Sequence, residues 1–183
     1  MNQKKLSALL MIFGLFMAFT VHSTDHRATS NGLIFEWRGE FNAAEKEKLK
    51  AWIMSVANTA KLLHGQPPRE TIRIVFQPYP AREAVPFARV LRNEPQGLLF
   101  YINPDFSLND FISDWTAYHE ISHLFIPFPG NADIWFSEGL ASYYQNILQL
   151  RAGLLTPAET RQKFSAAFKR GYDDANHADL TLG

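Results

Sequence analysis

The sequence predicts an α+β fold with a small mixed sheet, and three observations support this prediction. Apolar, β-branched runs typical of strands occupy the first hundred residues, with one helical stretch between them. Three further stretches with helical spacing follow after residue 106. The 183 residues are 46% hydrophobic and 20% charged, which excludes a largely disordered chain and suits one domain.

Two features of the composition limit the function. Lys plus Arg and Asp plus Glu both total 18, so the net charge is zero and no nucleic-acid partner is expected. The chain has no cysteine, which excludes disulfides, cysteine-ligated zinc, iron–sulfur clusters and thiol catalysis. Any metal ion must therefore be held by histidines and carboxylates.

Residues 1–23 have the pattern of a secretory signal peptide. Lys4 and Lys5 precede an apolar stretch over residues 6–21, and we expect cleavage after Ser23. The stretch is short for a membrane-spanning helix, which needs about 20 residues, and an uncleaved anchor is the alternative. We therefore expect an exported protein, periplasmic or secreted, whose residues 24–183 form one domain without membrane contact after the leader is removed.

The first half of this domain is predicted to contain three strands and one helix. A strand is expected over residues 33–37, and the following helix begins after Asn42, which forms a capping-box pattern with Glu45. Gly65 supplies the stop signal of that helix. Two more strands are expected over residues 71–77 and 97–103, whereas residues 78–96 carry four prolines and are expected to form a loop or irregular edge structure.

The second half is predicted to be helical. Ser107 and Asp110 form a capping pattern, and an apolar stripe continues from there to Phe125. A second helix is expected from about residue 133 to 152, and a third from Thr156 to about residue 172, again with a capping-box acid, Glu159. The tail over residues 173–183 has no packing pattern.

The sequence HEISH at residues 119–123 falls inside the first of these helices. Residues four apart on a helix lie on the same face, so the imidazoles of His119 and His123 can reach one ion, and neutral imidazole suits zinc. Glu120 lies about 100° around the helix and can reach a water held on the metal, as a general base requires. From this motif alone, the alternative is a helix whose two histidines cover part of the core and bind no metal.

The next helix offers a third ligand. A catalytic zinc needs three protein ligands, and the short connection over residues 127–133 makes the two helices antiparallel neighbours. Glu138 then lies about as far after the bend as His123 lies before it, so it can complete the site. Gly139 lowers helix stability, and close approach of the two helices at the metal would explain its presence.

The two motifs, HEISH at 119–123 and WFSEGLASYY at 135–144, together resemble the gluzincins, the thermolysin-like superfamily of zinc metallopeptidases. The second motif is most similar to the glycyl-aminopeptidase family and to small peptidase-MA-like domains. The resemblance covers roughly residues 97–150 and implies a zincin-like HExxH helix packed against the Glu-bearing helix. It further implies that His119, His123 and Glu138 bind one Zn²⁺, that Glu120 is the general base, and that the strand over residues 97–103 is an edge strand open to a peptide substrate.

Several positions depart from the family pattern or lack an assigned role. Ser142 stands where related enzymes often carry an Asp that orients a histidine ligand. The downstream helical domain that often supplies an oxyanion donor is largely missing, as it would be in a chain truncated at its C-terminus, and Tyr144 is our candidate donor.

Trp115 and Trp135 are expected to pack the helix pair together. Arg82, Arg89 and Arg92 are expected on a solvated face, with contact to an acidic substrate as the alternative.

The sequence therefore predicts an exported zinc metallopeptidase of gluzincin type, which hydrolyses peptide bonds with a metal-activated water and Glu120 as base. Its expected partner is a peptide or protein substrate, and its oligomeric state is left open. One alternative is a catalytically inactive zinc-binding domain that acts as an envelope interaction module. The other is a purely structural helix pair without metal.

Overall fold

The computed structural model describes residues 28–177 and has an α+β fold, as predicted. The predicted signal peptide and the last six residues lie outside this range. The described elements, in chain order, are β1 (Ala28–Ser30), β2 (Leu33–Trp37), α1 (Ala43–His64), β3 (Ile72–Pro78), β4 (Phe87–Leu91), β5 (Gly97–Ile102), α2 (Leu108–Ser113), α3 (Thr116–Ser122), the short 3₁₀ helix η1 (Asn131–Asp133), α4 (Ile134–Arg151) and α5 (Pro157–His177).

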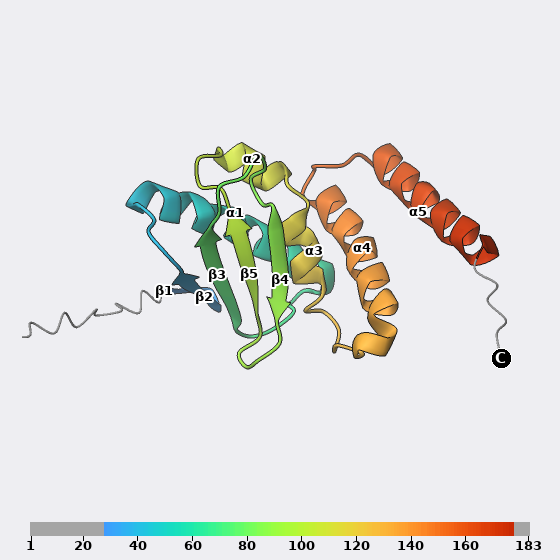
Figure 1. Ribbon diagram of the computed structural model, residues 1–183, viewed down its shortest axis with the longest axis horizontal. Helices are drawn as coiled ribbons and strands as arrows, with labels where there is room; N and C mark the ends of the chain where they lie inside the picture. The colour runs from blue at the N-terminus through green and yellow to red at the C-terminus, as the bar shows by residue number, and fades with distance from the viewer. Residues whose placement is uncertain (1–27, 178–183) are drawn as a thin grey trace, which may run out of the picture.

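The strands form one mixed sheet in the order β1-β2-β3-β5-β4. The three central strands β2, β3 and β5 are parallel, and β1 and β4 pair antiparallel at the two edges. Figure 1 shows α1 to α3 on one side of this sheet and α4 beside α3, with α5 extending away from the body. The β4 edge of the sheet lies next to α3, which in turn contacts α4.

The irregular segment predicted over residues 78–96 contains a strand, and this changes which strand is the edge. Residues 87–91 form β4, which pairs with β5 so that Phe87 faces Tyr101 and Leu91 faces Gly97. The strand over residues 97–103, expected at the edge, is therefore interior. Edge strands tolerate the prolines and charges that surround and interrupt this segment, so the sequence shows a weak strand signal there.

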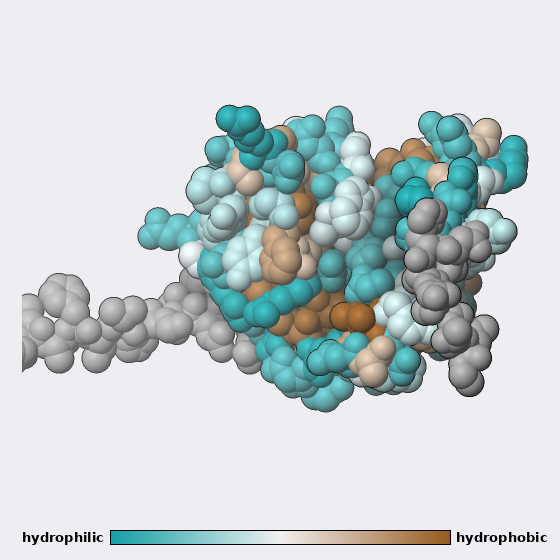
Figure 2. All heavy atoms as spheres, turned by 45° about the vertical axis from the view of Figure 1, so that its right-hand side comes forward, coloured by the Kyte–Doolittle hydropathy of each residue, from teal (hydrophilic) through white to brown (hydrophobic). Residues whose placement is uncertain are grey.

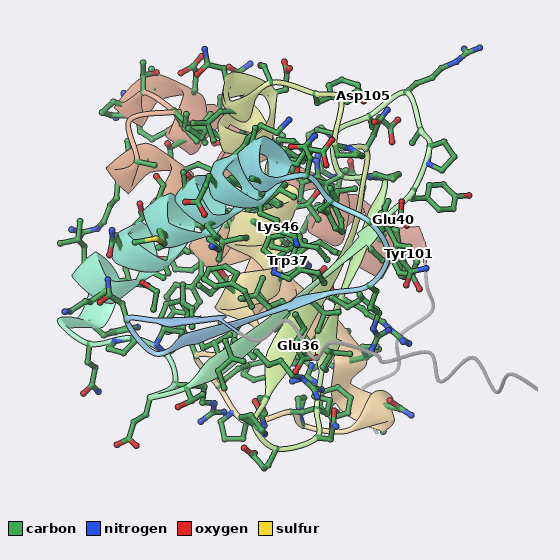
Figure 3. The ribbon with its side chains drawn as sticks, turned by 90° about the vertical axis from the view of Figure 1, so that its left-hand side faces the viewer. Glu36, Trp37, Glu40, Lys46, Tyr101 and Asp105 are labelled. Carbon is green, nitrogen blue, oxygen red and sulfur yellow. The ribbon has the colours of Figure 1, made fainter. Side chains whose placement is uncertain are left out.

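The hydrophobic core lies between the sheet and α1. Asn42 caps α1 as predicted, because its side chain accepts from the backbone N–H of Glu45 and the Glu45 carboxylate accepts from the backbone N–H of Asn42. Trp52 of α1 is fully buried and contacts the rings of Phe100 and Phe111 at 5.2 and 5.0 Å between centroids. Figure 3 shows α1 lying along the sheet.

At the N-terminal end of α1, Lys46 lies over the ring of Trp37 at 5.7 Å (Figure 3). This cation–π contact joins the first turn of α1 to the end of β2. Aromatic residues thus contribute to the attachment of α1 to the sheet, and α2 and α3 pack against α1.

The single helix expected from Ser107 to Phe125 is divided in two. Asp114 has an extended backbone conformation and ends α2, and its carboxylate accepts a hydrogen bond of 2.7 Å from the backbone N–H of Thr116 at the start of α3. An aspartate that bonds the backbone two residues ahead competes with a continuous helix, which explains the break. The histidine motif consequently lies on a helix of only seven residues, and His123 is its C-terminal cap.

The last two helices begin with the predicted signals. Thr156 and Glu159 form a capping box at the start of α5, which continues to His177, beyond the predicted end near residue 172. Tyr143 of α4 stacks on Phe164 of α5, while Phe168 further along α5 is 72% exposed. Within the described part of the chain, no helix is both long and apolar enough to cross a membrane.

Candidate metal centre

The site is built on α3 and α4, which run antiparallel next to each other (Figure 1). Tyr118 and Ile121 anchor α3 in the hydrophobic core, so the opposite face of this helix carries His119 and His123. On α4, Ser137 and Ala141 are buried against the rest of the protein. Glu138 is thereby placed at the same height as the two histidines.

Three ligand atoms converge between the two helices. The Nε2 atoms of His119 and His123 lie 3.2 Å apart, and the Glu138 carboxylate lies 3.1 Å from the first and 3.4 Å from the second. The histidine side chains are 12% and 5% exposed, whereas that of Glu138 is 51% exposed. The structure therefore brings together the three residues predicted as ligands and leaves the site open on the carboxylate side.

These spacings fit a tetrahedral zinc ion. Zinc binds histidine nitrogen and carboxylate oxygen at about 2.0–2.1 Å, so two ligands of a tetrahedral site lie roughly 3.3–3.4 Å apart. The two Nε2 atoms lie 3.2 Å apart, and Glu138 places Oε2 at 3.1 Å from Nε2 of His119 and Oε1 at 3.4 Å from Nε2 of His123. Three protein ligands leave the fourth position free, as in catalytic rather than structural zinc sites.

The outer nitrogens of both imidazoles have hydrogen-bond partners. Nδ1 of His119 lies 3.2 Å from Oε1 of Gln145, and Nδ1 of His123 lies 3.1 Å from Oγ of Ser137. A proton on each Nδ1 would leave both Nε2 lone pairs directed at each other and at Glu138, an arrangement that needs a cation between them. The orientation of these groups thus favours metal binding.

Gln145 and Ser137 were missed in the sequence. The residue expected to orient a histidine, Ser142, is exposed, and its backbone carbonyl accepts a hydrogen bond from Asn146 instead. Gln145 lies seven residues after Glu138, which is two helical turns along the same face, and this spacing is the signal that would have identified it.

The electrostatics of the site keep His123 in the form that binds metals. The pKa of His123 is lowered from its usual value to about 4, chiefly by burial; the charge of Glu138 opposes this shift, and those of His119 and Arg92 add to it. The imidazole is therefore neutral at pH 7, as a zinc ligand must be.

Glu120, the neighbour of His119 in the chain, lies on the side of α3 that borders β4 and is close enough to Glu138 for that charge to act on it. It borders a cavity of about 510 Å³ together with Phe87 and Ala88 of β4 and Trp115 and Thr116 at the start of α3. In the metal-free protein, the pKa of Glu120 is raised to about 7, chiefly by burial and also by the charge of Glu138, with Arg92 opposing the shift. A carboxylate with a pKa near neutrality, beside a ligand-accessible cavity, suits a general base.

This raised pKa predicts a pH-dependent stability difference. The folded-state pKa of Glu120 lies above its ordinary value of 4.5, so its contribution to stability is fully present below pH 4.5 and is lost as the pH rises through 7. We expect metal-free Glu120→Gln to be more stable than the metal-free wild type at pH 8, by on the order of 2 kcal/mol, and no more stable at pH 4. Urea unfolding at both pH values measures this, and equal differences at the two pH values would contradict it.

A second hollow, of about 660 Å³, lies on the other side of His119. It is bordered by Trp115, Gln145 and Gln149 and by Lys163 of α5. The ring of Trp115 lies 5.7 Å from that of His119, and Trp115 is 51% exposed. The two cavities therefore lie on either side of the helix that carries both histidines.

Trp115 and Trp135, which were expected to pack the two helices of the site together, are both exposed. Trp115 lies between the two cavities, and Trp135 in the first turn of α4 is 71% exposed, so neither is a core residue. Trp135 contacts Phe136, and Phe128 and Ile134 nearby in the chain are also exposed. Figure 2 shows hydrophobic surface in the lower part of this face, at the height where α4 begins in Figure 1.

The structure places Tyr144 among aromatic residues. Its ring lies 5.4 Å from that of Phe125 and 6.0 Å from that of His64 at the end of α1. It lies six residues after Glu138, which corresponds to a rotation of about 240° around α4, so the two side chains leave the helix in different directions. These contacts describe a packing role, and the assignment of Tyr144 as oxyanion donor stays a prediction.

Gly139 does not mark a close approach of α3 and α4. A Cβ atom added there would have nothing within 4 Å, so the proposed reason for this glycine was wrong. We therefore expect Gly139→Ala to raise the free energy of unfolding by about 1 kcal/mol through helix propensity alone.

Gly153 provides the matched comparison, because its φ of +76° ends α4 in the left-handed region. We expect Gly153→Ala to lower stability by about 1 kcal/mol. Denaturant titration of both variants checks the pair, and a loss of stability in Gly139→Ala would show that the space beside Glu138 is occupied in solution.

Comparison with known families supports a peptidase. The family model of the M61 glycyl aminopeptidases matches residues 129–181, which cover η1, α4 and α5 and therefore include Glu138. The match does not extend to His119, Glu120 or His123, so the histidine pair and its convergence with Glu138 are an independent observation. A comparison with curated proteins gives no match. The family match and the three-residue site together fit a gluzincin-type zinc metallopeptidase.

Proposed function

We propose that this protein is a zinc-dependent peptidase of gluzincin type. The observation that carries the proposal is the convergence of two Nε2 atoms and one carboxylate at 3.1–3.4 Å, the spacing of ligands around tetrahedral zinc. The family match over residues 129–181 supports peptide bonds as the substrate. His119, His123 and Glu138 hold the ion, and Gln145 and Ser137 orient the two imidazoles.

Glu120 supplies the acid–base chemistry in this proposal. When zinc is bound, it polarises the peptide carbonyl and lowers the pKa of a water molecule. Glu120 takes the proton of the attacking water and afterwards delivers it to the leaving amine. It borders the same cavity as Phe87 and Ala88 of β4, so a peptide bound along β4 would lie beside it.

The peptide is proposed to bind along β4. This strand pairs only with β5 in the described sheet, so its other edge is free to pair with an extended chain. The exposed side chains of Phe128, Ile134 and Trp135 provide an apolar surface for substrate residues close to α4. We further propose an exported location, based on the leader sequence at residues 1–23.

Metal analysis combined with a peptide mixture tests the function. The purified protein should contain about one zinc per chain and should cleave peptides, lose this activity on chelation and regain it when zinc is added. Zinc without any cleavage would leave a metal-binding domain without activity. The absence of zinc binding would leave a structural helix pair.

A further inference from the structure

An arginine at the end of β4 lies next to the metal centre without being part of it. Arg92 directly follows the last residue of β4, and its guanidinium carbon lies 4.3 Å from the centre of the Phe128 ring. Phe128 belongs to the connection between α3 and α4, which joins the helix that carries the histidines to the one that carries Glu138. The cation–π contact therefore holds the arginine at the lower end of β4, beside the site.

Arg92 faces the acidic residues of the site but is not neutralised by contact with them. The charges of Glu120 and Glu138 both act on its guanidinium and raise its pKa, against a larger lowering by partial desolvation. In the described part of the chain, Arg92 has no carboxylate oxygen within 4.0 Å and no hydrogen bond to another side chain. Its five N–H donors are thus free for a ligand.

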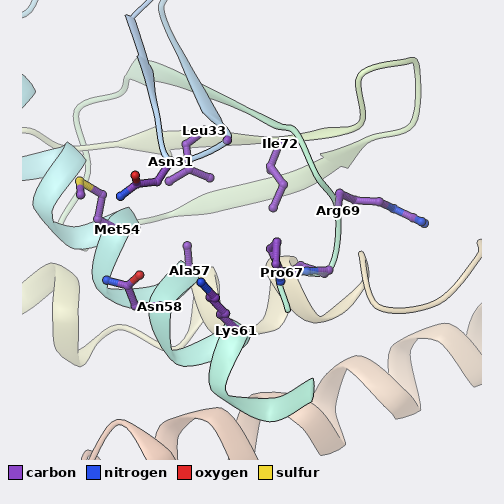
Figure 4. A pocket seen from close by; sticks show the side chains of 11 residues that line it. Asn31, Leu33, Met54, Ala57, Asn58, Lys61, Pro67, Arg69 and Ile72 are labelled. Atoms are coloured by element: carbon purple, nitrogen blue, oxygen red, sulfur yellow. The ribbon is translucent and has the colours of Figure 1, made fainter. Parts of the chain in front are cut away.

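A second arginine, Arg69, lies close enough to Arg92 for their positive charges to repel each other. The charge of Arg69 acts on Arg92 and lowers its pKa, as expected for like charges near each other. Arg69 borders a separate pocket of about 360 Å³ between α1 and the start of β3, but Figure 4 shows its side chain pointing away from the other labelled residues of that pocket. Its Nε atom is buried without a hydrogen-bond partner. An anion near both guanidinium groups would offset their repulsion and satisfy unused donors.

The position of Arg92 along β4 relates it to the substrate. The strand has five residues and is therefore about 17 Å long. Its first residue, Phe87, borders the cavity of Glu120, and Arg92 follows its last residue. A peptide extended along β4 would therefore bring a group about four or five residues from the scissile bond to Arg92.

We propose that Arg92, with Arg69 beside it, forms a subsite that binds a carboxylate of the peptide substrate. The carboxylate is either an acidic side chain or the free C-terminus of the peptide, since both offer the two oxygens that a guanidinium binds. The proposal rests on the proposed peptidase function, because it assigns a substrate preference to the same site. Arg92 is a specificity residue in this account and takes no part in the chemical step.

Binding to a protein that does not turn over tests the proposal directly. Zinc-loaded Glu120→Gln is titrated with labelled peptides that are identical except for Glu or Gln at one position, and with peptides that have a free or an amidated C-terminus. We expect at least one carboxylate-containing peptide to bind about tenfold more tightly than its neutral partner. The Glu/Gln pairs and the C-terminal pair distinguish the two sources of the carboxylate. The difference should decrease as salt is raised to 0.5 M.

Variants assign this preference to the arginine. Adding Arg92→Met should abolish the difference while leaving the affinity for neutral peptides unchanged, and Arg92→Lys should keep part of it. Arg82→Ala, which removes another exposed arginine before β4, is the matched control and should leave the preference intact. Equal binding of every peptide pair, or a preference that persists in Arg92→Met, would overturn the proposal.

Cleavage by the otherwise unchanged protein separates this proposal from the peptidase function. If the carboxylate preference is present in the binding assay but no peptide is cleaved, the peptidase function fails while the subsite stands. If peptides are cleaved with the same KM whether or not they carry a carboxylate, the subsite fails while the peptidase function stands. When both hold, Arg92→Met should raise KM for the acidic peptide about tenfold more than KM for its neutral partner.

Discussion

Glu120→Gln should lower kcat for peptide cleavage by about 10² to 10⁴-fold while the protein still binds about one zinc per chain. Glutamine keeps the size and the polar oxygen of the side chain but cannot accept the proton of the attacking water. Because Glu120 is not one of the three converging residues, its replacement leaves the ligand set unchanged. Steady-state kinetics with the substrate found in the peptide mixture, together with metal analysis, measure both effects.

Glu83→Gln is the matched control for this variant, since Glu83 borders the same cavity but is not assigned a role in the reaction. Its kcat should remain within a few-fold of the wild-type value. An unchanged kcat in Glu120→Gln would remove this residue as the base, and loss of zinc together with activity would mean that Glu120 supports the metal site instead.

His123→Ala should weaken zinc binding on the order of a thousandfold, because it leaves only two protein ligands on the ion. The same reasoning applies to His119→Ala and Glu138→Ala, which remove the other two members of the converging set. Competition with a fluorescent chelator measures the affinity, and circular dichroism establishes that each variant is folded.

Gln145→Ala provides the graded comparison, since it removes the hydrogen-bond partner of His119 but no ligand. Its zinc affinity should fall by about 10 to 100-fold, between the wild type and the ligand variants. Unchanged zinc affinity in all three ligand variants would contradict the metal centre, and unchanged affinity in Gln145→Ala alone would limit the role of this glutamine to packing.

Local signals in the sequence were sufficient for much of the fold. The capping boxes of Asn42 and Glu45 and of Thr156 and Glu159 are formed as predicted, since capping depends on residues only three apart. The three central strands also agree with the prediction to within one or two residues. In contrast, β4 was missed, because an edge strand flanked by prolines and arginines owes its conformation to pairing with β5 rather than to its own pattern.

The ligand set was predictable because helical spacing and a short connection determine it. His119 and His123 share a face at four residues' separation, and the connection returns Glu138 to the same height. The surroundings of the site were not predictable in this way. Trp115 is exposed because α2 and α3 are separate helices, a break caused by one hydrogen bond of Asp114. Arg92 reaches the site through the course of β4, which only the three-dimensional structure reveals.

The way α4 is attached has a consequence for the metal-free state. Only Ser137 and Ala141 are buried in the first half of this helix, so few apolar contacts hold it to the sheet and α1. A divalent ion bound by residues of both α3 and α4 would then link the C-terminal helices to the rest of the protein. Chelation should free the start of α4 to open locally and make the connection at residues 123–133 a preferred point of proteolytic nicking, with zinc availability governing how long the protein survives.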